Sequence, residues 1–105
     1  MARGDIHWAV LSGVDRRPFL VVTRTGSRHS KVTVATITRT VRGIASELNL
    51  GPREGLGLEC VANVDDLHTL PVVQLDPERV GRLTPTGHRR LDAALVYALG
   101  IRHAE

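Results

Sequence analysis

Apolar and polar residues alternate along the first two thirds of the chain, in short runs that are typical of β-strands. These runs predict strands over residues 4–11, 18–24, 31–40, 47–50 and 58–64. Residues 65–70 fit either a helical turn or an extended link, and two more short strands are expected around Asp-Pro-Glu, over 72–75 and 79–83. The pattern therefore predicts five to seven short strands.

The second and third of these segments differ in how their apolar residues are arranged. Residues 18–24 are apolar on both faces, which is typical of a central strand. Residues 31–40 are rich in β-branched side chains, which favour strands, and successive side chains point to opposite faces. One face of this segment therefore carries Val32, Val34, Thr36, Thr38 and Thr40, and the other carries Thr33, Ala35, Ile37 and Arg39.

Near the C-terminus the apolar residues recur at the three- and four-residue intervals of a helix. Thr84 can cap its first turn, Pro85 suits the first helical position, and Gly100 can end it. One face of this helix is lined by Leu91, Leu95, Ala98 and Leu99. Short strands followed by one amphipathic helix favour a mainly β fold, a small and strongly bent barrel or barrel-like sheet with the helix packed on it.

The composition fits one small globular unit. A length of 105 residues suffices for a single domain, residues 1–105, with a modest core, and 42% of the residues are apolar. No apolar run approaches the roughly 18 residues that span a bilayer, and the first residues lack the apolar block of a secretory signal. The single cysteine, Cys60, excludes an internal disulfide framework. We therefore expect a cytoplasmic protein with no membrane contact.

The charges are distributed unevenly along the chain. The span from Arg16 to Ser46 contains seven basic residues and no Asp or Glu, and the net charge of +3 therefore leaves −4 for the rest. Thirteen of the fourteen basic residues are arginines, whose planar guanidinium suits phosphate recognition, although a codon bias toward arginine explains the excess equally well. The acid-free span favours an anionic partner.

Familiar metal-binding and nucleophilic patterns are absent from the sequence. The one histidine with a carboxylate at helical spacing is His88, and its pairing with Asp92 is expected to be a surface contact. No G-x-S-x-G motif occurs, and no glycine-rich phosphate loop follows a strand. Cys60 lies in an apolar strand and is expected to be a buried, unreactive thiol. We therefore expect neither a metal nor a cofactor.

Arg17 and the threonines of residues 31–40 remain as candidates for chemistry. If residues 18–24 and 31–40 form a hairpin, the start of the first strand lies beside the end of the second. Arg17 should then cluster with Thr38, Arg39 and Thr40, where a guanidinium and a hydroxyl could hold a phosphate. The simpler alternative is that these threonines are strand-forming residues with satisfied hydroxyls.

Five sequence blocks, taken together, resemble the MazF/PemK toxins, which are the endoribonuclease halves of type II toxin–antitoxin pairs. The resemblance runs from about Arg3 to Ile101 and is carried by RGDIHWAVL, RRPFLVV, VTVATITRTVRGI, GLGLECVANVDDLHTL and VGRLTPTGHRRLDAALVYALG. It implies a small SH3-like barrel, a symmetric homodimer, a cognate antitoxin as partner, and metal-independent cleavage of single-stranded RNA. A non-catalytic toxin of the same fold, such as a gyrase-poison-like protein or a decayed paralogue, remains the alternative.

The resemblance also implies site residues. Arg17, before the strand proline, and Thr38, at the end of the third strand, match the family's catalytic pair. The acid-free span, rather than the resemblance, supplies the expected RNA-binding residues, which are Arg16, Arg24, Arg28, Arg39, Thr40 and Arg42. The role of Arg16 does not come from the family, which often has a small or neutral residue at this position. The chain departs from the family in its short first loop and in Glu59-Cys60, where many relatives have Asp-Ser.

Overall fold

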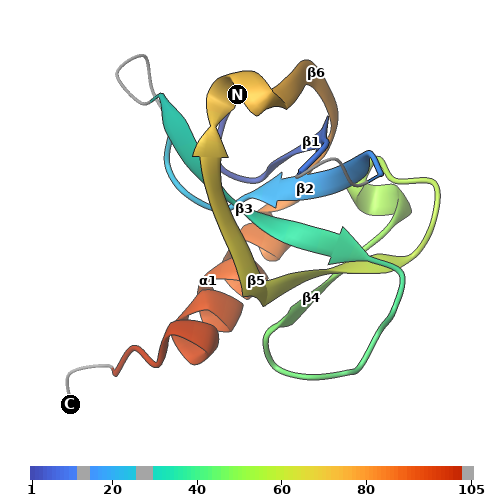
Figure 1. Ribbon diagram of the computed structural model, residues 1–105. Coiled ribbons are helices and arrows are strands. Elements are labelled where there is room, and N and C mark those ends of the chain that lie inside the picture. Colours follow the sequence, from blue (N-terminus) through green and yellow to red (C-terminus); the bar gives the residue numbers. More distant parts are fainter. Residues whose placement is uncertain (12–14, 26–29, 103–105) are drawn as a thin grey trace.

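The computed structural model describes residues 1–11, 15–25 and 30–102. Within these ranges the chain forms six strands, two short 3-10 helices and one α-helix (Figure 1). The strands are β1 (Asp5–Ala9), β2 (Arg17–Val21), β3 (Lys31–Thr38), β4 (Glu47–Leu50), β5 (Cys60–Pro71) and β6 (Leu75–Arg82). The 3-10 helices are η1 (Pro52–Glu54) and η2 (Val72–Gln74), and the α-helix is α1 (Pro85–Leu99).

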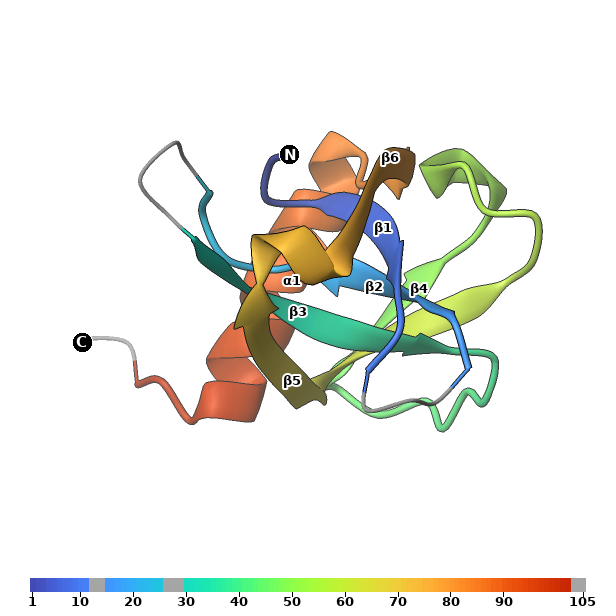
Figure 2. The same ribbon diagram turned by 45° about the horizontal axis from the view of Figure 1, so that its top comes forward.

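The six strands form one antiparallel sheet with the order β4-β5-β3-β2-β1-β6. The strand that is apolar on both faces, β2, lies inside the sheet, as predicted. The sheet curls strongly (Figure 2), but in the described part of the chain its edge strands β4 and β6 do not pair. The predicted mainly β fold with a C-terminal helix is therefore confirmed, as an open, barrel-like sheet.

The structure decides between the alternatives for residues 65–70 and corrects the region after them. Residues 65–70 are extended and belong to the long strand β5. The prediction of two short strands over 72–75 and 79–83 is wrong, because residues 72–74 form η2 and β6 runs on through Asp-Pro-Glu. Since β6 is an edge strand that pairs only with β1, Pro77 needs no N–H for a second neighbour. Register shifts on either side of His7 accommodate the extra residues of β6.

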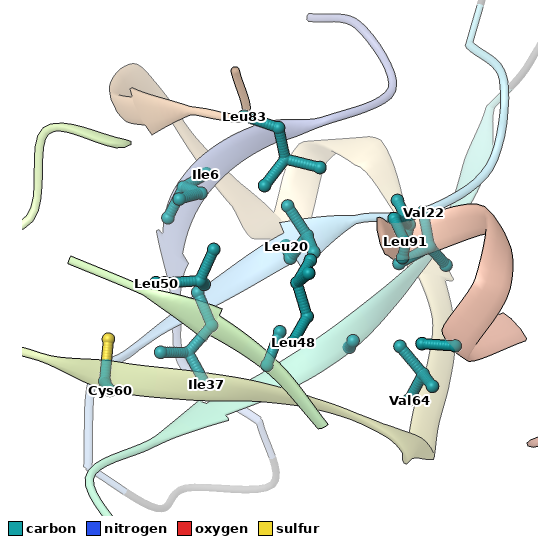
Figure 3. Close-up of a cluster of buried hydrophobic side chains, with 13 residues drawn as sticks. Ile6, Leu20, Val22, Ile37, Leu48, Leu50, Cys60, Val64, Leu83 and Leu91 are labelled. Carbon is teal, nitrogen blue, oxygen red and sulfur yellow. The ribbon is translucent and has the colours of Figure 1, made fainter. Parts of the chain in front are cut away.

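Apolar side chains pack on both faces of the sheet. The larger cluster connects the sheet to α1 and includes Leu20, Ile37 and Leu91 (Figure 3). The second cluster lies on the other face and consists of Ala9, Phe19, Val21, Val32, Val34, Leu70 and Leu75. The predicted alternation along β3 is confirmed, since Val32 and Val34 belong to one cluster and Ala35 and Ile37 to the other.

The helix α1 begins and ends as its capping residues predicted. The Thr84 hydroxyl oxygen accepts a 3.0 Å hydrogen bond from the Gly87 N–H, and Gly100 ends the helix with a left-handed φ of 68°. Leu91 is fully buried, but Leu99 is 59% exposed, which corrects its predicted place on the packed face. The last turn of α1 extends beyond the sheet (Figure 1), so Leu99 has no strand to cover it. No helix among the described residues is long and apolar enough to cross a bilayer.

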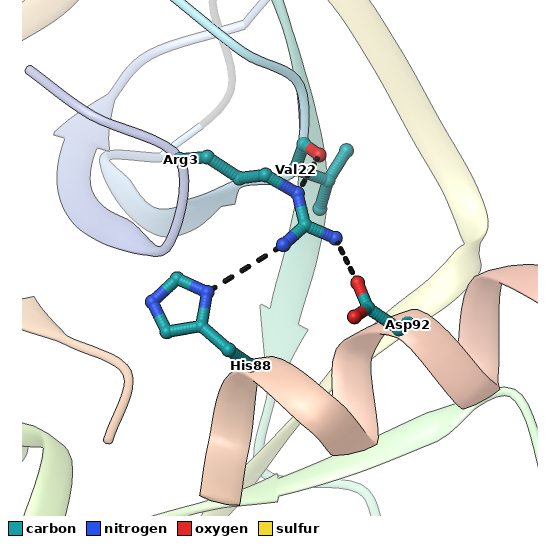
Figure 4. Close-up of polar contacts among 4 residues, drawn as sticks. All are labelled: Arg3, Val22, His88 and Asp92. Carbon is teal, nitrogen blue, oxygen red and sulfur yellow. Dashed lines mark hydrogen bonds and ion pairs between the residues drawn. The ribbon is translucent and has the colours of Figure 1, made fainter. Parts of the chain in front are cut away.

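Arg3 connects the start of the chain to α1 (Figure 4). Its guanidinium lies 2.6 Å from an Asp92 carboxylate oxygen and 3.5 Å from His88 Nδ1, while its Nε donates a 3.0 Å hydrogen bond to the Val22 carbonyl. His88 and Asp92 are therefore bridged by Arg3, and within the described residues the expected contact between the two forms neither an ion pair nor a hydrogen bond. A Cβ at Gly4 would collide with the His88 ring, so glycine allows this close approach.

Candidate active site

Arg17 and Thr38 lie at the same end of the β2–β3 pair. Phe19 pairs with Thr36, and the same antiparallel register, extended by two residues, places Arg17 opposite Thr38. Arg17 opens β2 and Thr38 closes β3, and each strand is also held by its outer neighbour, β1 or β5. The structure therefore brings the two residues together, as the hairpin geometry predicted.

A cavity of about 590 Å³ lies at this end of the sheet. Its polar lining consists of Asp15, Arg16, Arg17, Thr38 and Arg39, so three guanidinium groups face one carboxylate, and its apolar lining includes Trp8, Pro18, Ile37, Leu56, Leu58 and Cys60. Guanidinium groups suit a phosphate, and the aromatic and aliphatic surface suits a nucleobase. The cavity therefore combines the two kinds of surface that bind a single nucleotide.

The neighbouring arginines at positions 16 and 17 have different surroundings. The Arg16 guanidinium lies 5.2 Å from the centre of the Trp8 ring and 2.7 Å from an Asp76 carboxylate oxygen. The Arg17 side chain is exposed, and within the described residues it forms no ion pair or side-chain hydrogen bond. Arg16 is therefore held by the protein, whereas the charge of Arg17 is available to a ligand.

Asp76 ties the Arg16 side chain to β1. Its backbone carbonyl accepts a 2.8 Å hydrogen bond from His7 Nδ1, so Nδ1 carries the imidazole proton, because a carbonyl can only accept. Its carboxylate accepts hydrogen bonds from the Glu78 N–H at 3.0 Å and from Arg16. The His7 Nε2 is buried and has no partner within the described residues. These contacts fix the position from which Arg16 faces the cavity.

The Thr38 hydroxyl already has one hydrogen-bond partner. Its oxygen lies 3.2 Å from the backbone nitrogen of Thr40, which donates to it. Because this bond uses a lone pair of the hydroxyl oxygen, the hydroxyl proton remains available to an acceptor such as a phosphoryl oxygen. The contact gives the exposed Thr40 a positioning role beside Thr38.

A second cavity, of about 550 Å³, also includes Arg17 in its lining. Its other lining residues include Phe19, Thr36, Asp66, His68 and Gln74. The His68 ring meets Phe19 edge-on with ring centres 6.3 Å apart, and His68 Nε2 lies 3.0 Å from an Asp66 carboxylate oxygen. Arg17 and Asp15 are therefore shared by two hollows of different chemistry, one with three arginines and a largely apolar wall and one with the Asp66 carboxylate, an imidazole and an amide.

The other predicted RNA-binding residues are not all brought to this site. Arg39 lines the first cavity, but Arg24 follows the far end of β2, away from Arg17. Arg42 lies in the connection between β3 and β4, where the Glu47 carboxylate accepts hydrogen bonds from the backbone N–H groups of residues 42 and 43. Arg28 lies outside the described residues.

Cys60 has the environment of an unreactive thiol. It is 8% exposed, and burial, followed by the negative charge of Glu54, raises the pKa of the Cys60 thiol above its ordinary value. The predicted buried thiol is therefore confirmed, although Cys60 also lines the first cavity. In residues 1–11, 15–25 and 30–102, no group of three or more His, Cys, Asp or Glu side chains is placed to hold a metal ion.

Several residues of the two cavities gave no signal in the sequence. Trp8 alternates with Ile6 on one side of residues 4–11, and nothing in that pattern indicates its place beside Arg16. Asp66 and His68 fall on one face only if residues 65–70 are extended, and the sequence left that open. Leu56 and Leu58 come from the irregular segment before β5, and the prediction of a strand over 58–64 is wrong at its start, because β5 begins at Cys60.

Comparison with known proteins identifies relatives along most of the chain. The family described as PemK-like, MazF-like toxins of type II toxin–antitoxin systems matches residues 2–99. The probable endoribonuclease MazF2 of Mycobacterium tuberculosis is 42% identical over 88 residues, which cover 81% of this chain and 84% of MazF2. The probable endoribonuclease MazF5 of the same organism is 33% identical over 101 residues, covering 93% of this chain and 92% of MazF5.

Solved structures show the same fold. The Mycobacterium tuberculosis toxin MazF-mt6 superposes with a TM-score of 0.85 at 34% sequence identity, over 94% of this chain and 99% of that protein. An endoribonuclease from a mycobacterial species, solved in complex with its cognate antitoxin, superposes with a TM-score of 0.87 at 27% identity, over 99% of both chains.

Proposed function

Because the chain belongs to the family of PemK-like, MazF-like toxins of type II toxin–antitoxin systems, we propose that it is the endoribonuclease of such a pair and cleaves single-stranded RNA without a metal ion. The observation that carries this proposal is the placement of Arg17 and Thr38 across one cavity. An exposed guanidinium without an ion-pair partner within the described residues, opposite a hydroxyl with a proton to donate, suits a phosphodiester.

The proposed reaction uses the ribose of the substrate as its nucleophile. The 2′-oxygen loses its proton and attacks the adjacent phosphorus, and the bond from phosphorus to the 5′-oxygen breaks. The departing 5′-oxygen takes up a proton, so the products are a 2′,3′-cyclic phosphate and a 5′-hydroxyl. Negative charge grows on the phosphoryl oxygens in the transition state, and Arg17 stabilises it. Because guanidinium stays protonated at physiological pH, Arg17 acts as a fixed positive charge and not as the base.

Thr38 and the two cavities position the substrate in this proposal. The Thr38 hydroxyl donates to a phosphoryl oxygen or to the 2′-oxygen, in a direction set by the hydrogen bond from Thr40. The nucleotides on either side of the scissile phosphate enter the two cavities that share Arg17. Bases must be unstacked to fit such hollows, which favours single-stranded RNA over a duplex.

We also infer a symmetric homodimer and a cognate antitoxin. Large apolar side chains remain exposed, with Val73 91% exposed and Leu58 54% exposed, and a second copy could cover part of this surface. An acidic antitoxin segment would lie along the first cavity, with its three arginines, and exclude RNA. Light scattering of the purified protein tests the dimer, and competition between an acidic antitoxin peptide and labelled RNA tests the shared site.

The cleavage proposal is tested with purified protein and a single-stranded RNA in EDTA. We expect cleavage that persists in EDTA and leaves fragments with a 5′-hydroxyl and a cyclic phosphate. Arg17→Ala protein prepared in the same way controls for contaminating nucleases. Equal cleavage by this variant, or growth arrest with intact RNA, would contradict the proposal and favour a non-catalytic toxin.

A further inference from the structure

A second concentration of arginines lies away from Arg17, in a hollow of about 710 Å³. Its lining includes Arg3, Arg53, Arg79, Arg82 and His88, and Asp5 is its only carboxylate. We call this surface the basic hollow. Its residues come from the N-terminal segment, η1, β6 and the start of α1, which lie along one edge of the molecule (Figure 2).

Two close backbone approaches assemble the basic hollow. Gly4 lies against the His88 ring and brings the N-terminal segment to α1. Gly81 lies against the Glu54 carbonyl oxygen so closely that a Cβ there would collide with it. This second contact holds η1, with Arg53, against the end of β6, with Arg82. The arginines are therefore placed by the packed backbone rather than by loops.

Two of the four arginines of the basic hollow have an ion-pair partner, Arg3 with Asp92 and Arg79 with Asp5, and the other two have none within the described residues. Asp5 is 8% exposed, accepts a 2.8 Å hydrogen bond from the backbone nitrogen of Ala2, and lies 3.7 Å from Arg79. Arg53 and Arg82 are exposed, and neither forms an ion pair within the described residues. Because the Asp5 carboxylate already contacts Ala2 and Arg79, the side chains of Arg53 and Arg82 can contact an external anion.

The basic hollow and the candidate active site lie at opposite ends of one strand. Ala9 of β1 pairs with Arg17, whereas Asp5 of β1 pairs with Arg82. Four residues of extended strand separate these two pairs by about 13 Å. An RNA strand with its scissile phosphate at Arg17 is long enough to reach the hollow with phosphates a few nucleotides away.

We propose that the basic hollow is a second RNA-binding surface, which holds the phosphate backbone of the substrate outside the cleavage site. This inference rests on the proposed cleavage of RNA. The lining contains no Phe, Tyr or Trp, and its one aromatic ring, His88, packs against Gly4 and Arg3. The arginines therefore contact phosphates and carry no sequence information. The hollow therefore increases affinity for long RNA and leaves the cleavage sequence unchanged.

The salt dependence of RNA binding tests this proposal. Each phosphate contact on a single strand contributes about 0.7 to the slope of log affinity against log salt. In an Arg17→Ala background, which prevents cleavage, Arg53→Gln with Arg82→Gln should reduce that slope by about 1.4 for a labelled 20-nucleotide RNA. The matched control is Arg89→Gln with Arg102→Gln, which removes the same charge from residues outside the hollow. This control should change the salt slope of RNA affinity less than the substitutions in the hollow do.

A short RNA separates this proposal from the cleavage mechanism. With the native Arg17, the Arg53→Gln, Arg82→Gln protein should cleave a trinucleotide, which is too short to reach the hollow from Arg17, as fast as the wild type. This result would also show that the variant is folded. An unchanged salt slope for the long RNA would overturn the proposal, even if the wild type cleaves. A weakened interaction with the antitoxin and an unchanged one with RNA would also overturn it. Failure of the wild type to cleave the short RNA would instead contradict the proposed function.

Discussion

Arg17 and Thr38 stand opposite each other where β2 begins and β3 ends, in the register that pairs Phe19 with Thr36. Both strands are held on their outer sides by further strands, so their backbones cannot shift independently. A site built on paired strands keeps its geometry better than one built on loops. This relationship makes the relative backbone positions of Arg17 and Thr38 a property of the sheet.

Replacing Thr38 by valine tests the role of its hydroxyl. The substitution keeps the branched shape that favours a strand and removes one hydrogen bond to a charged group, which is worth about 1.5–3 kcal/mol. We expect single-turnover RNA cleavage to slow by roughly 10- to 100-fold with little change in stability. Thr33→Val is the matched control, because Thr33 lies in the same strand and bonds Thr69 instead. Equal effects of the two substitutions would show that Thr38 has no special role.

Gly81 should tolerate no side chain. A Cβ at this position would meet the Glu54 carbonyl, so Gly81→Ala must push η1 away from β6. We expect a loss of about 1–3 kcal/mol in the free energy of unfolding, measured by denaturant titration. For Gly57, where nothing lies within 4 Å of a Cβ, the same substitution should leave stability unchanged or slightly raised. A stable Gly81→Ala protein would show that the contact with η1 can relax.

Cys60 should resist alkylation in the folded protein. Burial and the charge of Glu54 raise the pKa of the Cys60 thiol, and only the thiolate reacts. Iodoacetamide should therefore modify the native protein far more slowly than the unfolded protein at pH 8. Since the folded state keeps its thiol proton to a higher pH, this group makes stability fall as pH rises above the ordinary thiol pKa. This contribution to the pH dependence of stability should be absent in Cys60→Ala.

Features set by local chemistry could be predicted from the sequence. The caps at Thr84 and Gly100 fixed both ends of α1, because capping depends on the residue itself and its immediate neighbours. Arg17 and Thr38 could be placed together because consecutive antiparallel strands bring the start of one beside the end of the next.

Features that depend on tertiary partners could not be predicted from the sequence. Asp-Pro-Glu is a turn signal in isolation, and only the edge position of β6 allows Pro77 inside a strand. Leu99 fits the apolar face of α1 but extends past the sheet. The basic hollow gave no signal for the same reason, because its arginines lie in three separate segments outside the acid-free span. The charge pattern along the chain gives no sign that they meet.

The central claim is that Arg17 stabilises the transition state and Arg16 does not. It is tested most directly by the single-turnover rate of cleavage of one RNA, at saturating protein, by Arg17→Ala and Arg16→Ala. Losing a group that stabilises charge in the transition state costs roughly 10²- to 10³-fold. We predict a loss of that size for Arg17→Ala and only a small part of it for Arg16→Ala, whose guanidinium is already bound by Asp76 and Trp8. Equal losses, or a larger loss for Arg16→Ala, would contradict the account.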